Sequence, residues 1–122
     1  MLTDLTKRQV EDWVGRYLTA WRSNDPKDIA AVFTNDADAH ELPYETDSEG
    51  LGEIVALWQE RSTWEGTGEW TFEWEEVAIN GDTFVITGVG HYPALGDFSN
   101  LWVVTLNPDG KASTFRMWNN QV

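Results

Sequence analysis

The stretch that most constrains the fold lies between Arg16 and Pro43, where a helix end, a helix start and a strand follow one another closely. Asp25-Pro26 predicts the start of a short helix, because an Asp side chain can cap free backbone N–H groups and proline at the first helical position gives up only an N–H that has no partner. The apolar residues that follow have the spacing of one buried helical stripe: Ile29, Val32 and Phe33. The polar segment 34–36 breaks this pattern and predicts the end of the helix.

A strand over residues 37–42 is expected next. Because side chains alternate between the two faces of a strand, one face holds Ala37, Ala39 and Glu41, and the other holds Asp38, His40 and Leu42. If the first face is turned inward, the two small alanines leave open space beside Glu41. A carboxylate beside open space is a candidate acid or base.

Two longer helices are predicted over Thr6–Ser23 and Leu51–Arg61. Thr6 and Gln9 have the capping-box spacing at the start of the first helix. The apolar residues of that helix form one broad stripe that must face a sheet: Val10, Trp13, Val14, Tyr17, Leu18 and Trp21. Tyr17 is the one residue of the stripe with a hydroxyl group. Two roles are open for it: a core aromatic whose hydroxyl reaches a backbone carbonyl, or a polar group of a binding site.

Four strands are expected in the second half of the chain, over residues 69–79, 83–92, 100–106 and 112–118. The apolar alternation of the first changes phase, which predicts a β-bulge near Glu75-Glu76. Asn80-Gly81 predicts a hairpin turn. Gly88 and Gly90 share a face and indicate a bend or a group packed close to the backbone. Helices followed by long strands predict an α+β domain, in which a curved sheet wraps around the first helix and leaves a pocket.

The segment from Pro43 to Gly50 is acidic and rich in turn-forming residues, so it is expected to be a mobile rim. Its acidic residues lack the fixed spacing of a calcium loop, and no histidine pairs with them at a helical interval. We therefore predict neither a metal nor a cofactor.

The order of these predicted elements resembles that of a known protein family. A helix, an Asn-Asp-Pro break, a short helix ending near Phe33 and a strand with a carboxylate are similar to the nuclear transport factor 2-like superfamily, which includes SnoaL-like proteins, ketosteroid isomerases and scytalone dehydratases. Gly50–Gln59 resembles the third helix of that family, and Asn107–Lys111 resembles the turn before its last strand. The resemblance implies a single SnoaL-like domain over residues 1–122. Its expected fold is a cystatin-like α+β cone with a mostly antiparallel sheet around three N-terminal helices and an internal apolar pocket.

The resemblance also implies roles for individual residues. Tyr17, which follows an arginine on the first helix, corresponds to the oxygen donor of the isomerases. Glu41 corresponds to their general base, with Glu in place of Asp. Trp58 and Trp102 stand where the isomerases have a supporting tyrosine and a protonated aspartic acid, so steroid isomerisation itself is disfavoured.

An aromatic pocket is expected from the tryptophan content, since eight tryptophans occur in 122 residues. Such a pocket suits a small apolar or aromatic ligand, although the same tryptophans could equally be packing residues. His40 and His91 are interpreted as structural histidines. The residues predicted to line the pocket are Trp13, Trp21, Tyr44, Trp58, His91, Trp102 and Trp118.

Charge and hydropathy limit the partners. The net charge of −13 would repel nucleic acid and anionic lipid. No apolar run approaches the roughly 20 residues of a membrane span, and the charged N-terminal residues argue against a secretory signal. We therefore expect a soluble cytoplasmic protein that binds neither nucleic acid nor membranes.

Three hypotheses for function follow. The first is an enzyme of isomerase, cyclase or dehydratase type, in which Glu41 moves a proton and Tyr17 stabilises an oxygen. The second is a non-catalytic module that binds a ligand in the aromatic pocket. The third is an association domain that pairs with a second copy through the outer face of the sheet, and a homodimer is expected in any of the three.

Overall fold

The computed structural model describes residues 4–42, 46–62, 70–93 and 96–121. These residues contain three helices: α1 (Lys7–Ser23), α2 (Pro26–Ala30) and α3 (Leu51–Ser62). Six strands accompany them: β1 (Phe33–Leu42), β2 (Thr46–Glu49), β3 (Thr71–Asn80), β4 (Thr83–Tyr92), β5 (Gly96–Leu106) and β6 (Ala112–Gln121). Among the described residues, no helix is both long and apolar enough to cross a membrane.

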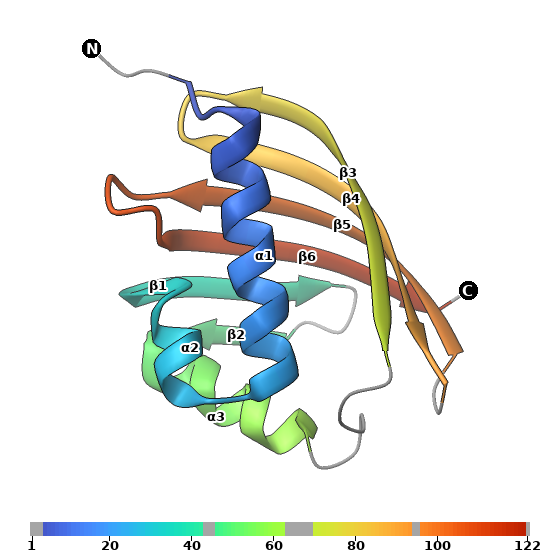
Figure 1. Ribbon diagram of the computed structural model, residues 1–122. Helices are drawn as coiled ribbons and strands as arrows, with labels where there is room; N and C mark the ends of the chain where they lie inside the picture. The colour runs from blue at the N-terminus through green and yellow to red at the C-terminus, as the bar shows by residue number, and fades with distance from the viewer. Residues whose placement is uncertain (1–3, 43–45, 63–69, 94–95, 122) are drawn as a thin grey trace.

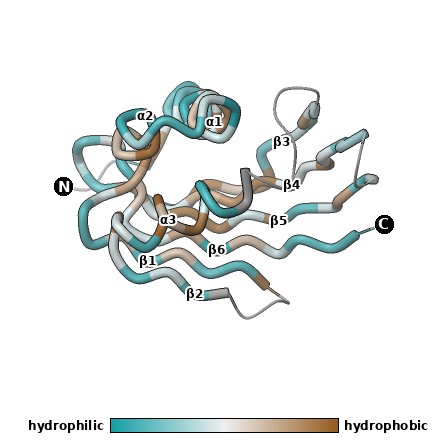
Figure 2. Tube along the Cα trace, turned by 90° about the horizontal axis from the view of Figure 1, so that it is seen from below, coloured by the Kyte–Doolittle hydropathy of each residue, from teal (hydrophilic) through white to brown (hydrophobic). Residues whose placement is uncertain are grey.

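The strands form one curved sheet in the order β2-β1-β6-β5-β4-β3, in which β1 and β6 are parallel and the other neighbours are antiparallel. Helix α1 runs across the concave face of the sheet (Figure 1). Seen from one end, all three helices lie on the same side of the sheet (Figure 2). The predicted α+β architecture with a curved sheet around the helices is confirmed.

Hydrogen bonds at its two ends and in its middle fix the position of α1. Thr6 and Gln9 form the predicted capping box, with bonds of 3.1 and 2.8 Å between side chain and backbone. Asn24 ends the helix in the left-handed conformation, and its Nδ2 donates to the carbonyl of Trp58 on α3 over 2.9 Å. Arg16 donates to the carbonyls of Ala31 and Gly110. These contacts set the rotation of α1, which directs Tyr17 toward the sheet.

The acidic segment before α3 differs from expectation. Residues 46–49 are not a loop, because they form the edge strand β2, antiparallel to β1. Ser48 is buried there. The polar segment 34–36 is likewise part of β1, with a shift in the pairing of β1 with β6 between Phe33 and Asp38. Both segments are strands because they pair with a neighbouring strand, and the local sequence does not show which neighbour is available.

The expected features of β3 and β4 are confirmed. The register of this pair shifts between Glu76 and Ala78, where a bulge was predicted. Asn80 and Thr83 close the hairpin, with Gly81 at a φ of 63°. On the inner face of β4, Gly88 leaves room for the ring of Phe72, since a Cβ at Gly88 would lie 2.3 Å from the ring. The glycine therefore lets an aromatic ring approach the backbone.

The core lies between α1 and the sheet and is largely aromatic. Trp13 is fully buried at its centre, with edge-to-face contacts to Phe33, Phe84 and Trp102. Its indole N–H donates to the carbonyl of Val32 over 3.1 Å, so its polar atom is satisfied. This dense packing fills one end of the space under the sheet and leaves the other end, near the last turn of α1, for a cavity.

Candidate functional site

A cavity of about 400 Å³ opens between the last turns of α1, helix α3 and the inner face of the sheet. Its size is that of a small-molecule site. Most of its wall is aromatic or aliphatic, and a few polar side chains are set into it. The residues that line it are Tyr17, Leu18, Trp21, Phe33, Ala39, His40, Glu41, Ser48, Ile54, Leu57, Trp58, Trp70, Phe72, Gly90, Tyr92, Phe98, Asn100, Trp102, Phe115, Met117, Asn119 and Gln121.

Aromatic contacts hold the wall in place. The ring of Tyr17 stacks on Phe115 at a centroid distance of 5.4 Å and packs against Trp102 at 4.5 Å. Trp21 and Trp58 meet edge to face at 4.9 Å. Because each ring is fixed by at least one other, the cavity keeps its shape without a ligand.

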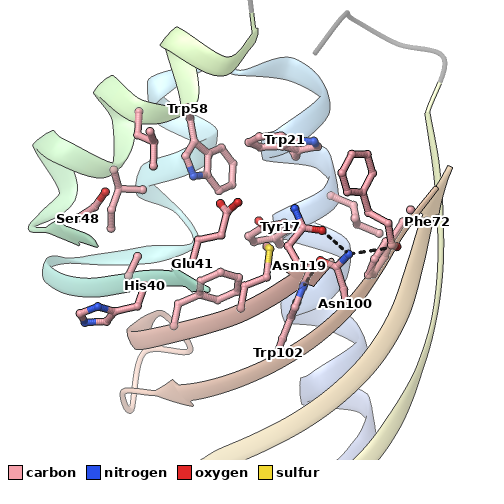
Figure 3. Close-up of a pocket in the computed structure, with 18 of the residues that line it drawn as sticks. Tyr17, Trp21, His40, Glu41, Ser48, Trp58, Phe72, Asn100, Trp102 and Asn119 are labelled. Atoms are coloured by element: carbon pink, nitrogen blue, oxygen red, sulfur yellow. Dashed lines mark hydrogen bonds between the residues drawn. The ribbon is translucent and has the colours of Figure 1, made fainter. Parts of the chain in front are cut away.

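Glu41 and Tyr17 both line this cavity. Glu41 lies on β1, on the same face as Ala37, which is buried, and Ala39, which also borders the cavity. Figure 3 shows the Glu41 carboxylate directed into the open space, with Tyr17 on the α1 side of it. This inward carboxylate beside two small alanines is the arrangement expected for the case in which this face of the strand is turned inward. The catalytic roles of Tyr17 and Glu41 stay predictions.

His40 has a different surrounding from Glu41, its neighbour in the chain. Its ring is directed away from the cavity (Figure 3) and binds two aspartates, with Nδ1 2.5 Å from Asp47 and Nε2 3.1 Å from Asp38. The hydrogen bond to Asp47, and then the one to Asp38, raises the pKa of His40 above its ordinary value. These contacts join β1 to the edge strand β2.

A row of polar groups crosses the inner face of β5 and β6. The indole N–H of Trp102 donates to Oδ1 of Asn100 over 3.0 Å. Nδ2 of Asn100 in turn donates to Oδ1 of Asn119 over 3.1 Å. Asn100 and Asn119 were not predicted as site residues, and the pairing of β5 with β6 that joins them is a tertiary feature.

The structure brings some of the predicted lining residues together. Trp21, Trp58 and Trp102 line the cavity together with Tyr17 and Glu41. Tyr44 lies outside the described residues. Three other predicted lining residues do not border the cavity: Trp13, His91 and Trp118.

Each of these three corrections has a physical reason. Trp13 lies one turn of α1 before Tyr17 and is enclosed in the core. His91 lies between the inward residues Gly90 and Tyr92, so it faces outward, where its Nδ1 is 2.8 Å from Asp97. Trp118 is 37% exposed on the outer face of the sheet, because Met117 and Asn119 take the inner positions of β6.

Several lining residues could have been found from alternation alone. Phe115 is buried, and a step of two along β6 leads from it to Met117 and Asn119. The same step on β5 leads from Trp102 back to Asn100 and Phe98. Polar residues at inward strand positions are therefore the signal that the prediction passed over.

In the described part of the chain, no group of three or more His, Cys, Asp or Glu side chains is placed to hold a metal ion. Two carboxylates and a histidine do meet at His40, but they bind one another on the sheet surface. The polar groups that the lining residues direct into the cavity are a carboxylate, hydroxyl groups, amides and indole N–H groups.

The protein is an α+β domain in which a curved, open mixed sheet faces the first helix and a cavity lies beside that helix. A family model for the SnoaL-like domain matches residues 14–119. The chain belongs to the SnoaL-like family, as the sequence resemblance implied. No curated protein matches it by sequence.

Solved structures show the same fold. A SnoaL-like protein of unknown function from Burkholderia thailandensis is 17% identical, with a TM-score of 0.76 over 96% of this chain and 98% of that one. A proposed SnoaL-like polyketide cyclase from Shewanella denitrificans is 15% identical, with a TM-score of 0.76 over 94% and 92%. A proposed ketosteroid isomerase from Kribbella flavida is 11% identical, with a TM-score of 0.71 over 94% and 80%. At these identities the likeness shows the fold and not the reaction.

Proposed function

We propose that the protein is an acid/base enzyme that removes a proton from a carbon next to a carbonyl group in a small, mainly apolar substrate. The observation on which this rests is that Glu41 and Tyr17 line one aromatic cavity. A carboxylate can take the proton, and a tyrosine hydroxyl can donate a hydrogen bond to the oxygen on which negative charge develops. Returning the proton to another carbon gives isomerisation. Attack of the carbanion on a second carbonyl carbon, with the proton returned to that oxygen, gives cyclisation, and loss of a neighbouring hydroxyl group as water gives dehydration.

The surroundings of the two groups favour this chemistry. Most of the cavity wall is apolar, and electrostatic interactions are stronger in such a site than in bulk water. The similar structures described as a polyketide cyclase and a ketosteroid isomerase support a carbonyl-containing substrate, since both names denote ketone compounds. Steroid isomerisation stays disfavoured, because Trp102 donates its N–H to Asn100 and cannot act as a second acidic donor.

Exchange of carbon-bound hydrogen for deuterium tests the proposal without knowledge of the natural substrate. The probe is 2-tetralone, a bicyclic ketone with exchangeable protons next to its carbonyl, followed by proton NMR in D2O. We expect the protein to accelerate exchange above the buffer rate. Glu41→Gln should reduce the acceleration by about 10² to 10⁴ and Tyr17→Phe by about 10 to 10².

A matched control is Asp36→Asn, because Asp36 is an exposed carboxylate on the same strand as Glu41 and does not line the cavity. This variant should keep the exchange rate of the unchanged protein. Exchange that is equally fast in Glu41→Gln would overturn the role of Glu41. Tight binding of ketones without any acceleration would favour the alternative, a ligand-binding module that uses the aromatic wall alone.

A further inference from the structure

Asn100 and Asn119 are direct cross-strand partners on β5 and β6, and both line the cavity. Asn100 stands between two partners: its Oδ1 accepts from Trp102 over 3.0 Å, and its Nδ2 donates to Asn119 over 3.1 Å. The same nitrogen also donates to the carbonyl of Phe98 over 3.3 Å. Both polar ends of the Asn100 amide are therefore occupied.

Trp102 fixes the direction of this hydrogen-bond relay, which runs from Trp102 through Asn100 to Asn119. An indole N–H can only donate, so Asn100 must present its oxygen to Trp102 and its nitrogen to Asn119. Asn119 must then turn its own oxygen toward Asn100 and its nitrogen away from it. Trp102 is itself held by stacking on Phe72 at a centroid distance of 5.1 Å, so the start of the relay is immobile.

The amide nitrogen of Asn119 faces the cavity. Figure 3 shows it directed into the open space on the side where Glu41 and Tyr17 lie. The side chain of Asn119 makes no further hydrogen bond within the described part of the chain, so its Nδ2 protons are available to a ligand. A donor whose orientation is set in advance loses little conformational entropy when it binds.

We propose that Asn119 is a specificity-determining residue that donates a hydrogen bond to an oxygen acceptor of the ligand. This inference rests on the proposed use of the cavity as a ligand site and adds a polar contact that the proposed reaction does not require. The ligand class that fits is a neutral aromatic or alicyclic compound with a carbonyl or ether oxygen.

The charges around the cavity support a neutral ligand. Among the described residues that line it, none is a lysine or arginine, and Glu41 contributes a carboxylate. An anionic ligand would move from water into a cavity that offers it no cation, and this transfer is unfavourable in an apolar site. An ammonium group, for its part, has no acceptor to offer Asn119.

Binding of two probes of the same shape tests the proposal. The probes are 2-tetralone and its hydrocarbon counterpart tetralin, which lacks the oxygen, and affinity is followed by tryptophan fluorescence. A hydrogen bond to the ketone should make 2-tetralone bind about three- to tenfold more tightly than tetralin. We expect Asn119→Leu to remove most of this ratio. Asn120→Leu, on the exposed outer side of the same strand, should leave the ratio unchanged.

Asn100→Asp provides a second variant, which reverses the direction of the relay and also adds a carboxylate to the cavity wall. An aspartate at this position accepts from Trp102 and must also accept from Asn119, so the Asn119 amide turns and presents its oxygen to the cavity. The ratio should then fall below that of the unchanged protein. All binding measurements are repeated with Tyr17→Phe, so that the ketone cannot instead accept from Tyr17.

The side-chain ¹⁵N–¹H signals of Asn119 give a direct measurement on the unchanged protein, and 2-tetralone should shift them while tetralin should not. The inference is overturned if Asn119→Leu leaves the ratio unchanged, if it weakens both probes equally, or if the unchanged protein binds the two probes alike. Its failure is distinct from failure of the proposed reaction. Loss of exchange in Glu41→Gln does not depend on Asn119, and the affinity ratio does not depend on proton transfer.

Discussion

The ring of Phe72 on β3 lies directly against the backbone of Gly88 on β4. A Cβ at Gly88 would come within 2.3 Å of Phe72 Cζ and 2.9 Å of the carbonyl oxygen of Glu73. Phe72 also stacks on Trp102 and borders the cavity. The absence of a side chain at one glycine thus sets the position of one wall of the site.

Gly88→Ala should therefore destabilise the protein and displace the ring of Phe72. We expect a loss of about 1 to 3 kcal/mol in the free energy of unfolding, measured by urea denaturation, as is typical of overpacking. Phe72→Leu in the same background should recover part of this loss, because it removes the clashing ring atoms. Gly52→Ala is the control, since a Cβ at Gly52 meets nothing within 4 Å. A Gly88→Ala variant as stable as the control would show that the two strands separate at little cost.

Asn24 joins the end of α1 to α3. Two variants separate the effect of losing its side-chain hydrogen bond from the effect of straining its backbone. Its φ is 54°, a left-handed conformation that asparagine tolerates but that costs most other residues with a Cβ about 1 to 2 kcal/mol. Its side chain donates to the carbonyl of Trp58. Asn24→Gly should lose only the hydrogen bond, about 1 kcal/mol. Asn24→Ala should lose about 1 kcal/mol more, because alanine is strained there. Equal stability of the two variants would contradict this account of the helix end.

The raised pKa of His40 predicts that the free energy of unfolding depends on pH. Its folded-state pKa is raised above 6.5, mainly by Asp47 and then by Asp38, so the charged form is favoured in the folded protein. The resulting stabilisation is fully present below about pH 6.5 and is lost as the pH rises through the folded-state pKa. Denaturation midpoints measured from pH 5 to 9 should show this loss, and Asp47→Asn should lower the pKa of His40 in an NMR titration. A His40→Gln variant with the same pH profile as the unchanged protein would assign the effect to other groups.

The two tryptophans wrongly predicted to line the cavity should differ in their importance for stability. Trp13 is fully buried and Trp118 is 37% exposed. Trp13→Ala should reduce the free energy of unfolding by about 3 to 5 kcal/mol, as for other large aromatic residues removed from a core. Trp118→Ala should change it by much less, within the range of ordinary surface substitutions. Similar losses for both would mean that Trp118 is covered in solution.

Periodicity predicted much of the fold and part of the site. Alternation along β1 placed Glu41 and His40 on opposite faces of the strand, because successive side chains of a strand point to opposite sides of the sheet. The same rule would have placed Trp118 outward, from the inward position of Phe115. The error came from treating a tryptophan as inward because it is hydrophobic, although large apolar residues also occur on the outer face of a sheet.

Other features depend on partners that the sequence does not identify. The segment 46–49 is a strand because the edge of β1 is available to it, and its polar residues give no local sign of this. Asn100 and Asn119 form a relay only because β5 and β6 pair in one particular register. The openness of the cavity is likewise a result of how the tryptophan rings pack against each other.

The central claim is that Glu41 and Tyr17 act on one ligand in the same cavity, and a crystal structure of Glu41→Gln with 2-tetralone tests it most directly. The account predicts the ketone oxygen within roughly 3.2 Å of the Tyr17 hydroxyl. It also predicts the carbon next to the carbonyl about 3 to 3.5 Å from the side chain at position 41. A ketone bound outside the cavity, or bound inside it with the carbonyl turned away from Tyr17 and the neighbouring carbon out of reach of position 41, would contradict the account.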